Sequence, residues 1–338
     1  MNLADLTKEE LMAELSIPKF KAAQIYKWIR KGETDPMNMT DQSKELRERM
    51  KENYEITFPK VYKKFASKID ETVKYLIEMA DGNIVEAVLM KYEHGRSICI
   101  STQVGCRMGC AFCASTMDGL IRNLTPSEIE GQIRAVSLDA TERISNVVMM
   151  GIGEPLDNLD NVLKALYAIN NEDGLSIGFR HITVSTCGLV KGIKRLMEEN
   201  LQITLALSLH ATDDIKRREI MPSAKATTVA ELVDLMEEYA KKTTRRVSYE
   251  YSLISGVNDS IENARDLAKL LKGKFCHVNL IEVNPVEGRD FKRGNNKYEF
   301  KKILENMGIN ATIRRELGKD ISASCGQLKK SIVKEDNL

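Results

Sequence analysis

The feature that most constrains the fold is a repeated unit, in which a short β-rich apolar run is followed by a turn and a stretch of helical period. The repeat begins near residue 96 and continues almost to the end of the chain. Alternating strands and helices predict an α/β fold with a parallel sheet, and six or more consecutive units predict a full or partial barrel. The expected strands are Ser97–Thr102, Asn146–Met150, His181–Ser185, Ile203–Leu209, Val247–Leu253, His277–Val283 and Ala311–Arg314.

Chemically unusual stretches follow five of these strands. In βα folds the carboxyl ends of parallel strands meet at one end of the barrel, where the catalytic groups are found. The sequence therefore predicts a single site built from several loops at that end. The stretches are Cys106–Cys113, Gly151–Pro155, Ser185–Gly188, Ser208–His210 and Asn284–Pro285.

The chain before the barrel is predicted to begin with helices and continue into a β-hairpin. Thr7–Glu10 fits a capping box, and a highly charged helix is expected from about Thr40 to Asn53. The alternating runs Thr72–Ala80 and Ile84–Met90 predict two strands joined by a turn at Asp81–Asn83. The predicted units are residues 1–60 (helical accessory domain), 61–95 (β-hairpin region), 96–330 (barrel with a C-terminal loop) and 331–338 (tail).

Composition excludes several classes of protein. The 50 basic and 49 acidic side chains give a formal charge of +1, which excludes a uniformly basic surface for nucleic acid. No apolar stretch reaches the roughly 18 residues of a membrane span, and the acidic N-terminus does not resemble a signal peptide. Seven cysteines, an odd number, do not form a secreted disulfide framework. We expect a cytoplasmic protein whose cysteines are free thiols or metal ligands.

Three of the cysteines, Cys106, Cys110 and Cys113, form a C-x3-C-x2-C cluster. They can be inert buried residues, although Arg107 and the flanking glycines make this a poor core segment. They can also bind zinc, which requires a fourth ligand. The histidines available for that role are His94, His181 and His210. A four-iron cluster held by three thiolates leaves one iron open to another ligand, and this option fits a set of three cysteines best.

The cluster, with Phe112 just before its last cysteine, resembles the signature of the radical S-adenosylmethionine (SAM) superfamily. The resemblance implies a partial (β/α)6 barrel, one [4Fe-4S] cluster on the three cysteines, and SAM bound to the open iron and cleaved to a 5′-deoxyadenosyl radical. Gly151–Glu154 is similar to the element that receives the amino group of SAM in that superfamily. By the same resemblance the residues that line the cofactor pocket are Gly153, Glu154, Ser185, Ser208, Leu209, His210 and Asn284.

The segment Asp320–Leu328 resembles the tail of one subfamily, the RNA adenine methyltransferases that modify C2 (RlmN) or C8 (Cfr). The resemblance runs from the N-terminal helices through Leu328, with Ser322 and Ser324 where we expect Asp and Ala. Glu154-Pro155 resembles the C2 enzymes, whose C8 relatives usually lack this proline. Two alternatives remain: a non-catalytic zinc RNA-binding module, and a radical glycyl activase, which would not need Cys325.

The resemblance assigns roles to three further residues. Cys325 would be methylated by one SAM, and a radical made from a second SAM would convert the methyl group into a methylene radical that adds to the adenine. Glu86 would then remove the C2 proton, and Cys99 would release the product by forming a disulfide with Cys325. Without the resemblance, Cys99 reads as a barrel-strand cysteine and Glu86 as the solvent-facing residue of an alternating strand. Cys187 and Cys276 are expected in the core.

The resemblance also implies partners. These are 23S rRNA at the peptidyl-transferase centre, tRNA at the adenosine next to the anticodon, and an external electron donor such as flavodoxin or ferredoxin, with the chain acting as a monomer. Two basic runs are candidates for contact with phosphates, or are solvated faces. The first contains Lys60, Tyr62, Lys63, Lys64, Phe65 and Lys68, and the second Lys292, Arg293, Lys297, Arg314 and Arg315.

Overall fold

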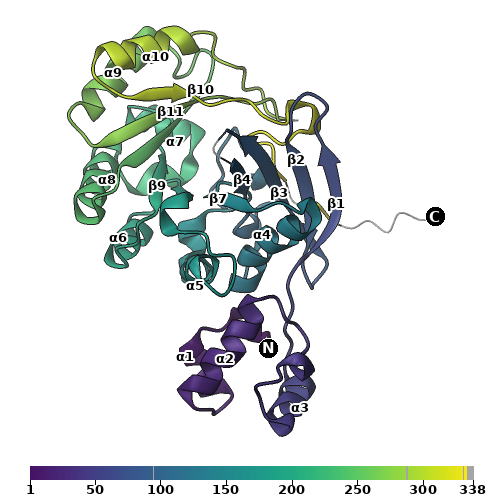
Figure 1. Cartoon of the computed structure of the whole chain (residues 1–338). Coiled ribbons are helices and arrows are strands. Elements are labelled where there is room, and N and C mark those ends of the chain that lie inside the picture. The colour runs from purple at the N-terminus through teal and green to yellow at the C-terminus, as the bar shows by residue number, and fades with distance from the viewer. Residues whose placement is uncertain (94, 287, 330, 333–338) are drawn as a thin grey trace.

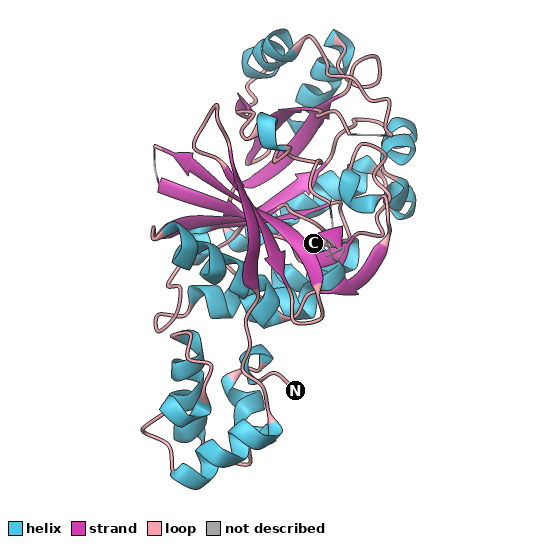
Figure 2. Cartoon of the chain, turned by 90° about the vertical axis from the view of Figure 1, so that its right-hand side faces the viewer, coloured by secondary structure: helices cyan, strands magenta, loops and turns pink. Residues whose placement is uncertain are grey.

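The computed structural model describes residues 1–93, 95–286, 288–329 and 331–332, and its centre is a curved sheet with helices on its outer side (Figures 1 and 2). Seven neighbouring strands of this sheet pair in parallel. The sheet runs from β1 to β12 without closing, which confirms the α/β class and the partial barrel. The parallel strands are β4 (Gly95–Cys99), β7 (Ile144–Met149), β8 (Ile182–Thr186), β9 (Thr204–Ser208), β10 (Val247–Leu253), β11 (Cys276–Glu282) and β12 (Ala311–Ile313).

Helices connect successive parallel strands and bury their apolar faces on the sheet. One of these helices follows the N-cap residue Thr125, whose side chain accepts a hydrogen bond from the backbone N–H of Glu128 while the Glu128 carboxylate accepts one from the backbone N–H of Thr125. This is a capping box, and Pro126 occupies the first turn of the helix. The helices are α4 (Pro126–Ala140), α5 (Leu159–Asn170), α6 (Val190–Glu198), α7 (Asp214–Ile220), α8 (Val229–Thr243), α9 (Ile261–Leu271) and α10 (Lys297–Asn306).

Three antiparallel strands extend the sheet beyond β4. The predicted hairpin is present as β2 (Val73–Glu78) and β3 (Asn83–Tyr92), and β3 pairs with β4. A further strand, β1 (Lys60–Ala66), lies at the edge of the sheet. It was not predicted because its side chains are mostly charged and exposed and show no apolar alternation. The short β13 (Ser331–Ile332) also pairs with β3. The hairpin region is thus continuous with the barrel sheet, while the division of the chain into units stays a prediction.

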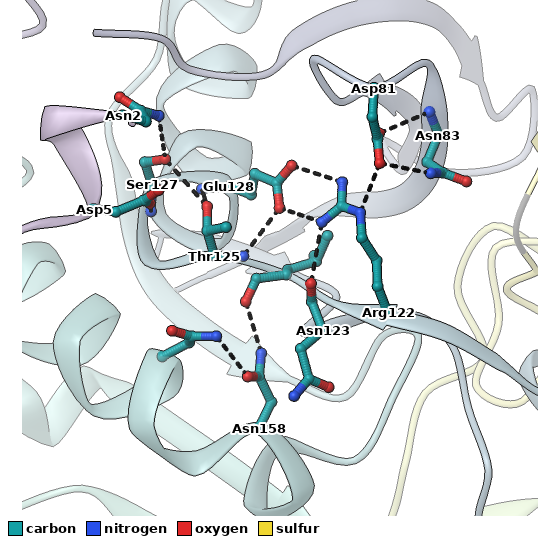
Figure 3. A network of polar contacts seen from close by, with 12 residues as sticks. Asn2, Asp5, Asp81, Asn83, Arg122, Asn123, Thr125, Ser127, Glu128 and Asn158 are labelled. Carbon is teal, nitrogen blue, oxygen red and sulfur yellow. Dashed lines mark hydrogen bonds and ion pairs between the residues drawn. The ribbon is translucent and has the colours of Figure 1, made fainter. Parts of the chain in front are cut away.

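A second, two-stranded sheet brackets the cysteines. It consists of β5 (Gln103–Gly105) and β6 (Leu120–Asn123), neither of which was expected. Arg122 of β6 reaches the carboxylates of Asp81 in the β2–β3 turn and Glu128 at the start of α4, as Figure 3 shows. The cysteine loop is therefore fixed to both the hairpin and the first barrel helix.

The N-terminal helices α1 (Lys8–Glu14), α2 (Lys19–Arg30) and α3 (Lys44–Asn53) form a small unit with its own apolar core, seen below the barrel in Figure 1. A buried ion pair joins it to the barrel through Arg30 of α2 and Glu130 of α4. The Asn2 side chain also donates a hydrogen bond of 3.0 Å to Ser127 Oγ (Figure 3). No helix of the described residues is long and apolar enough to cross a bilayer.

Candidate active site

The cysteine loop follows β4 and opens into a pocket at the carboxyl ends of the parallel strands. All three clustered cysteines, Cys106, Cys110 and Cys113, line this pocket. The neck of the loop is held by Asn158 (Figure 3), whose Nδ2 donates 2.8 Å hydrogen bonds to the carbonyls of Thr102 and Leu124. The two chain segments entering and leaving the loop are therefore fixed to one side chain, and the loop is held over the pocket.

The chemistry of these thiols fits an iron–sulfur cluster. Burial raises the pKa of the Cys106 thiol to about 12, and burial together with the neighbouring thiols raises that of Cys110. Burial also raises the pKa of Cys113. Thiols this close and this buried become thiolates only when a cation compensates their charge. Soft thiolates are the ligands that iron–sulfur clusters take, so the residues present fit the group.

A mononuclear zinc site is the alternative for this region. Among the described residues, no group of three or more His, Cys, Asp or Glu side chains is placed to hold a single metal ion. Two candidate fourth ligands are held through one ring nitrogen: Nδ1 of His181 bonds to Asn146 Oδ1 at 3.0 Å, and Nδ1 of His210 accepts from the backbone N–H of Ser252. His94 lies outside the described residues.

The Gly151–Glu154 turn places a buried carboxylate on the pocket wall. Glu154 accepts hydrogen bonds from the backbone N–H of Leu156 (3.0 Å) and of Cys187 (2.7 Å). Burial raises the pKa of this carboxyl, while these hydrogen bonds oppose the rise. Gly153 has φ of +108°, and a Cβ on it would lie 2.6 Å from Gln103 Cβ. Only glycine fits this turn beside the cysteine loop.

Most of the predicted cofactor contacts gather at this pocket. Its lining includes Gly153, Glu154, Ser185, Ser208, His210 and Asn284. The ring of His210 meets Phe112 edge-on at 5.0 Å between centroids, and burial, followed by the charge of Arg217, lowers its pKa to about 3. His210 is thus a neutral acceptor. Leu209 differs: its side chain is fully buried in the core and does not line the pocket, although its backbone N–H donates to Glu250.

Cys325 lies in the same pocket as the three clustered cysteines, although it comes from the far end of the chain. Its carbonyl accepts a 3.0 Å hydrogen bond from Nδ2 of Asn284. The next residues are tied to the cysteine loop, because Gly326 O accepts from the N–H of Ala114 (2.8 Å) and Leu328 O accepts from the hydroxyl of Ser115 (2.7 Å). The C-terminal loop therefore closes over the cysteine loop.

Cys99 lies behind the pocket wall. It is buried on β4, opposite Val88 of β3, and does not line the pocket. Burial raises the pKa of its thiol to about 12, and the nearby Cys325 adds to this rise. The structure therefore brings the two thiols into electrostatic reach of each other.

Glu86 is a buried carboxylate rather than the solvent-facing residue of an alternating strand. Its Oε1 lies 3.2 Å from Lys74 Nζ, and its Oε2 accepts a 3.1 Å hydrogen bond from the backbone of Lys329. Burial raises the pKa of Glu86, and the charge of Lys74 opposes that rise. Glu86 contacts the chain four residues after Cys325 but lies outside the pocket lining.

Two pocket residues were placed elsewhere by sequence reasoning. Arg314 was expected in a basic run facing RNA, but it lines the pocket 3.7 Å from Glu250, and the charge of Cys325 raises the pKa of its guanidinium. Its position at the carboxyl end of the predicted strand Ala311–Arg314 was the signal that could have identified it. Cys187 was expected in the core but also lines the pocket, whereas Cys276 is buried in the main core.

The basic runs are partly neutralised by acidic partners. Lys64 pairs with Asp139 at 2.7 Å, and Lys297 pairs with Glu282 at 2.6 Å. Tyr62 and Phe65 of β1 remain exposed beside the lysines of that strand. Contact of either run with RNA stays a prediction.

Comparisons with known proteins agree with this site. The model of the radical SAM superfamily matches residues 100–268, and that of the ribosomal RNA large subunit methyltransferase N-terminal domain matches residues 1–56. A probable dual-specificity RNA methyltransferase RlmN of Clostridium novyi is 50% identical over 341 residues, covering 99% of each chain. One from Lachnoclostridium phytofermentans is 52% identical over 349 residues, covering 100% of this chain and 98% of the relative.

A solved structure is similar over nearly the same length. The crystal structure of a radical SAM methyltransferase from Sphaerobacter thermophilus has a TM-score of 0.88 and 41% sequence identity, covering 97% of this chain and 99% of that one. These similarities exclude a non-catalytic zinc module and a glycyl activase as descriptions of the whole chain. The chain belongs to the RlmN family of radical SAM dual-specificity RNA methyltransferases.

Proposed function

We propose that this enzyme methylates C2 of adenosine in 23S rRNA, at the peptidyl-transferase centre, and in tRNA, at the adenosine next to the anticodon. The observation that carries the proposal is the presence of Cys325 in one pocket with Cys106, Cys110 and Cys113. A cysteine there can carry a methyl group, while the three clustered thiols hold the group that generates a radical.

The alternative is methylation of C8 by the same set of residues. The tight turn at Gly153 is followed by Glu154-Pro155, and Pro155 lines the pocket. The C8 relatives usually lack this proline, which favours C2. Both positions are electron-poor carbons without a lone pair, so ordinary transfer of a methyl cation from SAM to a nucleophile cannot modify them.

In the proposed reaction Cys106, Cys110 and Cys113 hold one [4Fe-4S] cluster. When bound, the cluster and SAM supply a methyl group and a 5′-deoxyadenosyl radical. The residues that would contact SAM are Gly153, Glu154, Ser185, Ser208, Leu209, His210 and Asn284, with Leu209 acting through its backbone. The buried Glu154 carboxylate suits an ammonium group, since an opposite charge stabilises its ionised form.

Cys325 is the residue that carries the methyl group. Its thiolate takes a methyl group to become S-methylcysteine, and loss of a hydrogen atom leaves a methylene radical. Addition of this radical to C2 joins the protein and the RNA covalently. The guanidinium of Arg314 lines the same pocket as Cys325.

Glu86 and Cys99 then resolve the adduct. Glu86 accepts the C2 proton, and one electron passes from the adduct radical to an oxidised one-electron carrier such as flavodoxin or ferredoxin, which restores the aromatic ring. The Cys99 thiolate attacks Sγ of Cys325, the bond from sulfur to the methylene carbon breaks, and that carbon takes a proton to become the methyl product. An external thiol must reduce the resulting disulfide, and flavodoxin or ferredoxin would supply electrons for radical formation.

A flipped adenosine must reach this pocket, because C2 is inaccessible in stacked RNA. We propose that the N-terminal unit, residues 1–60, contributes to holding the RNA. Its model match to the N-terminal domain of ribosomal RNA methyltransferases supports that role. We also propose that the enzyme acts in the cytoplasm as a monomer.

Methylation of defined RNA by the anaerobically purified, cluster-loaded chain tests the proposal. We expect 2-methyladenosine in 23S rRNA fragments and tRNA by nucleoside mass spectrometry, and no product from Cys325→Ala. Cys276→Ala, on the buried side of β11, is the matched control and should remain active. Formation of 8-methyladenosine would reject the C2 assignment, and an active Cys325→Ala variant would reject the role of Cys325.

A further inference from the structure

A buried arginine, Arg217, lies beside the pocket. Arg217 of α7 is 1% exposed, and its guanidinium donates hydrogen bonds to three main-chain carbonyls. These belong to Leu209 (3.1 Å from Nε), Ser208 (3.1 Å from Nη2) and Cys187 (2.6 Å from Nη2). No carboxylate of the described residues forms an ion pair with it; burial lowers the pKa of its guanidinium, and the charge of Asp214 is among the opposing influences. A buried charge without an ion-pair partner is costly, so a negatively charged group is expected nearby.

The helix that carries Arg217 lies against the cysteine loop. Ile220, the last residue of α7, accepts a 2.9 Å hydrogen bond from the backbone of Ala111, between two of the clustered cysteines. Ile220 also packs in one apolar cluster with Cys106 and Cys187. The guanidinium of Arg217 lies directly behind the pocket wall, because the carbonyls that its Nη2 contacts belong to Cys187 and Ser208, which both line the pocket.

We propose that Arg217 is a positioning residue that offsets the negative charge of the iron–sulfur cluster and thereby sets its reduction potential. The inference rests on the proposed assignment of the cluster to Cys106, Cys110 and Cys113. The cluster gains one negative charge on reduction, and a fixed positive charge in a low-dielectric setting stabilises the reduced state more than the oxidised state. Arg217 therefore makes the cluster easier to reduce.

The hydrogen bonds of Arg217 explain how its charge is held in place. The carbonyls that it contacts close β9 and the loop after β8, the two segments that carry Ser208 and Cys187 of the pocket wall. A guanidinium with its donors directed at fixed carbonyls cannot rotate away from the pocket. The same contacts fix the ends of two neighbouring strands that carry proposed contacts to SAM.

Redox titration of the cluster in full-length variants tests the inference. In Arg217→Gln we expect the equilibrium between reduced and oxidised cluster to shift at least tenfold toward the oxidised form, which is 59 mV for a one-electron couple. Arg217→Lys keeps the charge and should shift much less. Arg218→Gln is the matched control, because Arg218 is an exposed neighbour on the same helix. The reduction potential of the cluster in this variant should equal that in the unmodified chain.

Three outcomes would overturn the inference. The first is an unchanged reduction potential in Arg217→Gln. The second is a shift in Arg217→Lys as large as that in Arg217→Gln, because such a shift would assign the effect to the shape of the guanidinium and not to its charge. If Arg217→Gln assembles no cluster, the iron content of Arg217→Lys decides: near-normal loading supports the role of the charge, and no loading rejects it. An unmodified chain that binds no iron would refute the proposed cofactor as well, which distinguishes the two failures.

Discussion

Removing the buried Arg30 should loosen the attachment of the N-terminal unit to the barrel. The side chain of Arg30 is 1% exposed and that of Glu130 is fully buried, and they form an ion pair. Arg30 also donates a 2.7 Å hydrogen bond to Ala4 O, while Glu130 keeps a second partner, Arg134, at 2.9 Å. The variant Arg30→Met therefore leaves a buried carboxylate with only part of its compensation.

The size of the effect follows from this geometry. Removal of one partner from a buried ion pair lowers the free energy of unfolding by about 3–5 kcal/mol. Because Glu130 keeps its contact with Arg134, we expect Arg30→Met to lie at the lower end, about 3 kcal/mol. The double variant Arg30→Met/Glu130→Met removes both charges and should recover most of the loss. Lys27→Met, which breaks the exposed pair between Lys27 and Asp173, should change little.

Unfolding in urea, followed by tryptophan fluorescence, measures this effect on the N-terminal unit. The chain has one tryptophan, Trp28, which lies on α2 and donates a 2.8 Å hydrogen bond to Asp41, so its emission reports that unit. We expect the midpoint to move to lower urea in Arg30→Met and to return toward the original value in the double variant. If Arg30→Met behaved like Lys27→Met, the buried pair would not be what holds the unit to the barrel.

Three further predictions concern the pocket and its base. Lys74→Met removes the charge that opposes the raised pKa of Glu86, so the acidic limb of the pH–rate profile should move to higher pH; an unmoved limb would argue against Glu86 as the base. Gly153→Ala places a Cβ 2.6 Å from Gln103 Cβ at φ +108°, and should weaken SAM binding measured by calorimetry; normal affinity would contradict the described turn. Cys106→Ala should lose iron and sulfide in elemental analysis. Stoichiometric zinc without sulfide in the unmodified chain would instead contradict the cluster assignment.

The barrel and its site could be predicted because their signals are local. Each parallel strand is a short apolar run followed by a helix, and the conspicuous residues come directly after strands such as β7, β9 and β11. Register and chain order then bring them to one pocket. Cys325 is different, since nothing in its local sequence places it near the barrel mouth, and the similarity of the tail to a known family was needed to assign it.

The elements that were missed depend on long-range contacts. The edge strand β1 carries mostly exposed and charged side chains, so it has no apolar alternation to read. β5 and β6 are short, and they form because they pair across the cysteine loop. Arg314 looked like a surface charge, but the contacts of its guanidinium with Glu250 and Met150 arise only when β12 joins the sheet.

The tail shows how a departure from the family pattern is accommodated. Ser324 replaces an expected Ala, and its hydroxyl donates a 3.0 Å hydrogen bond to Leu317 O within the same loop. Ser322, where Asp was expected, adopts φ of +50° and closes the short helix Lys319–Ile321. With these two serines in the loop, Cys325 lines the pocket.

The central claim is that Cys325 carries the methyl group and that Cys99 releases the product. Its most direct test is denaturing electrophoresis and mass spectrometry of Cys99→Ala after reaction with SAM and substrate RNA. We predict a covalent protein–RNA adduct through a methylene bridge on Cys325, which is absent in Cys99→Ala/Cys325→Ala. Normal turnover of Cys99→Ala without an adduct, or an adduct at another residue, would contradict the account.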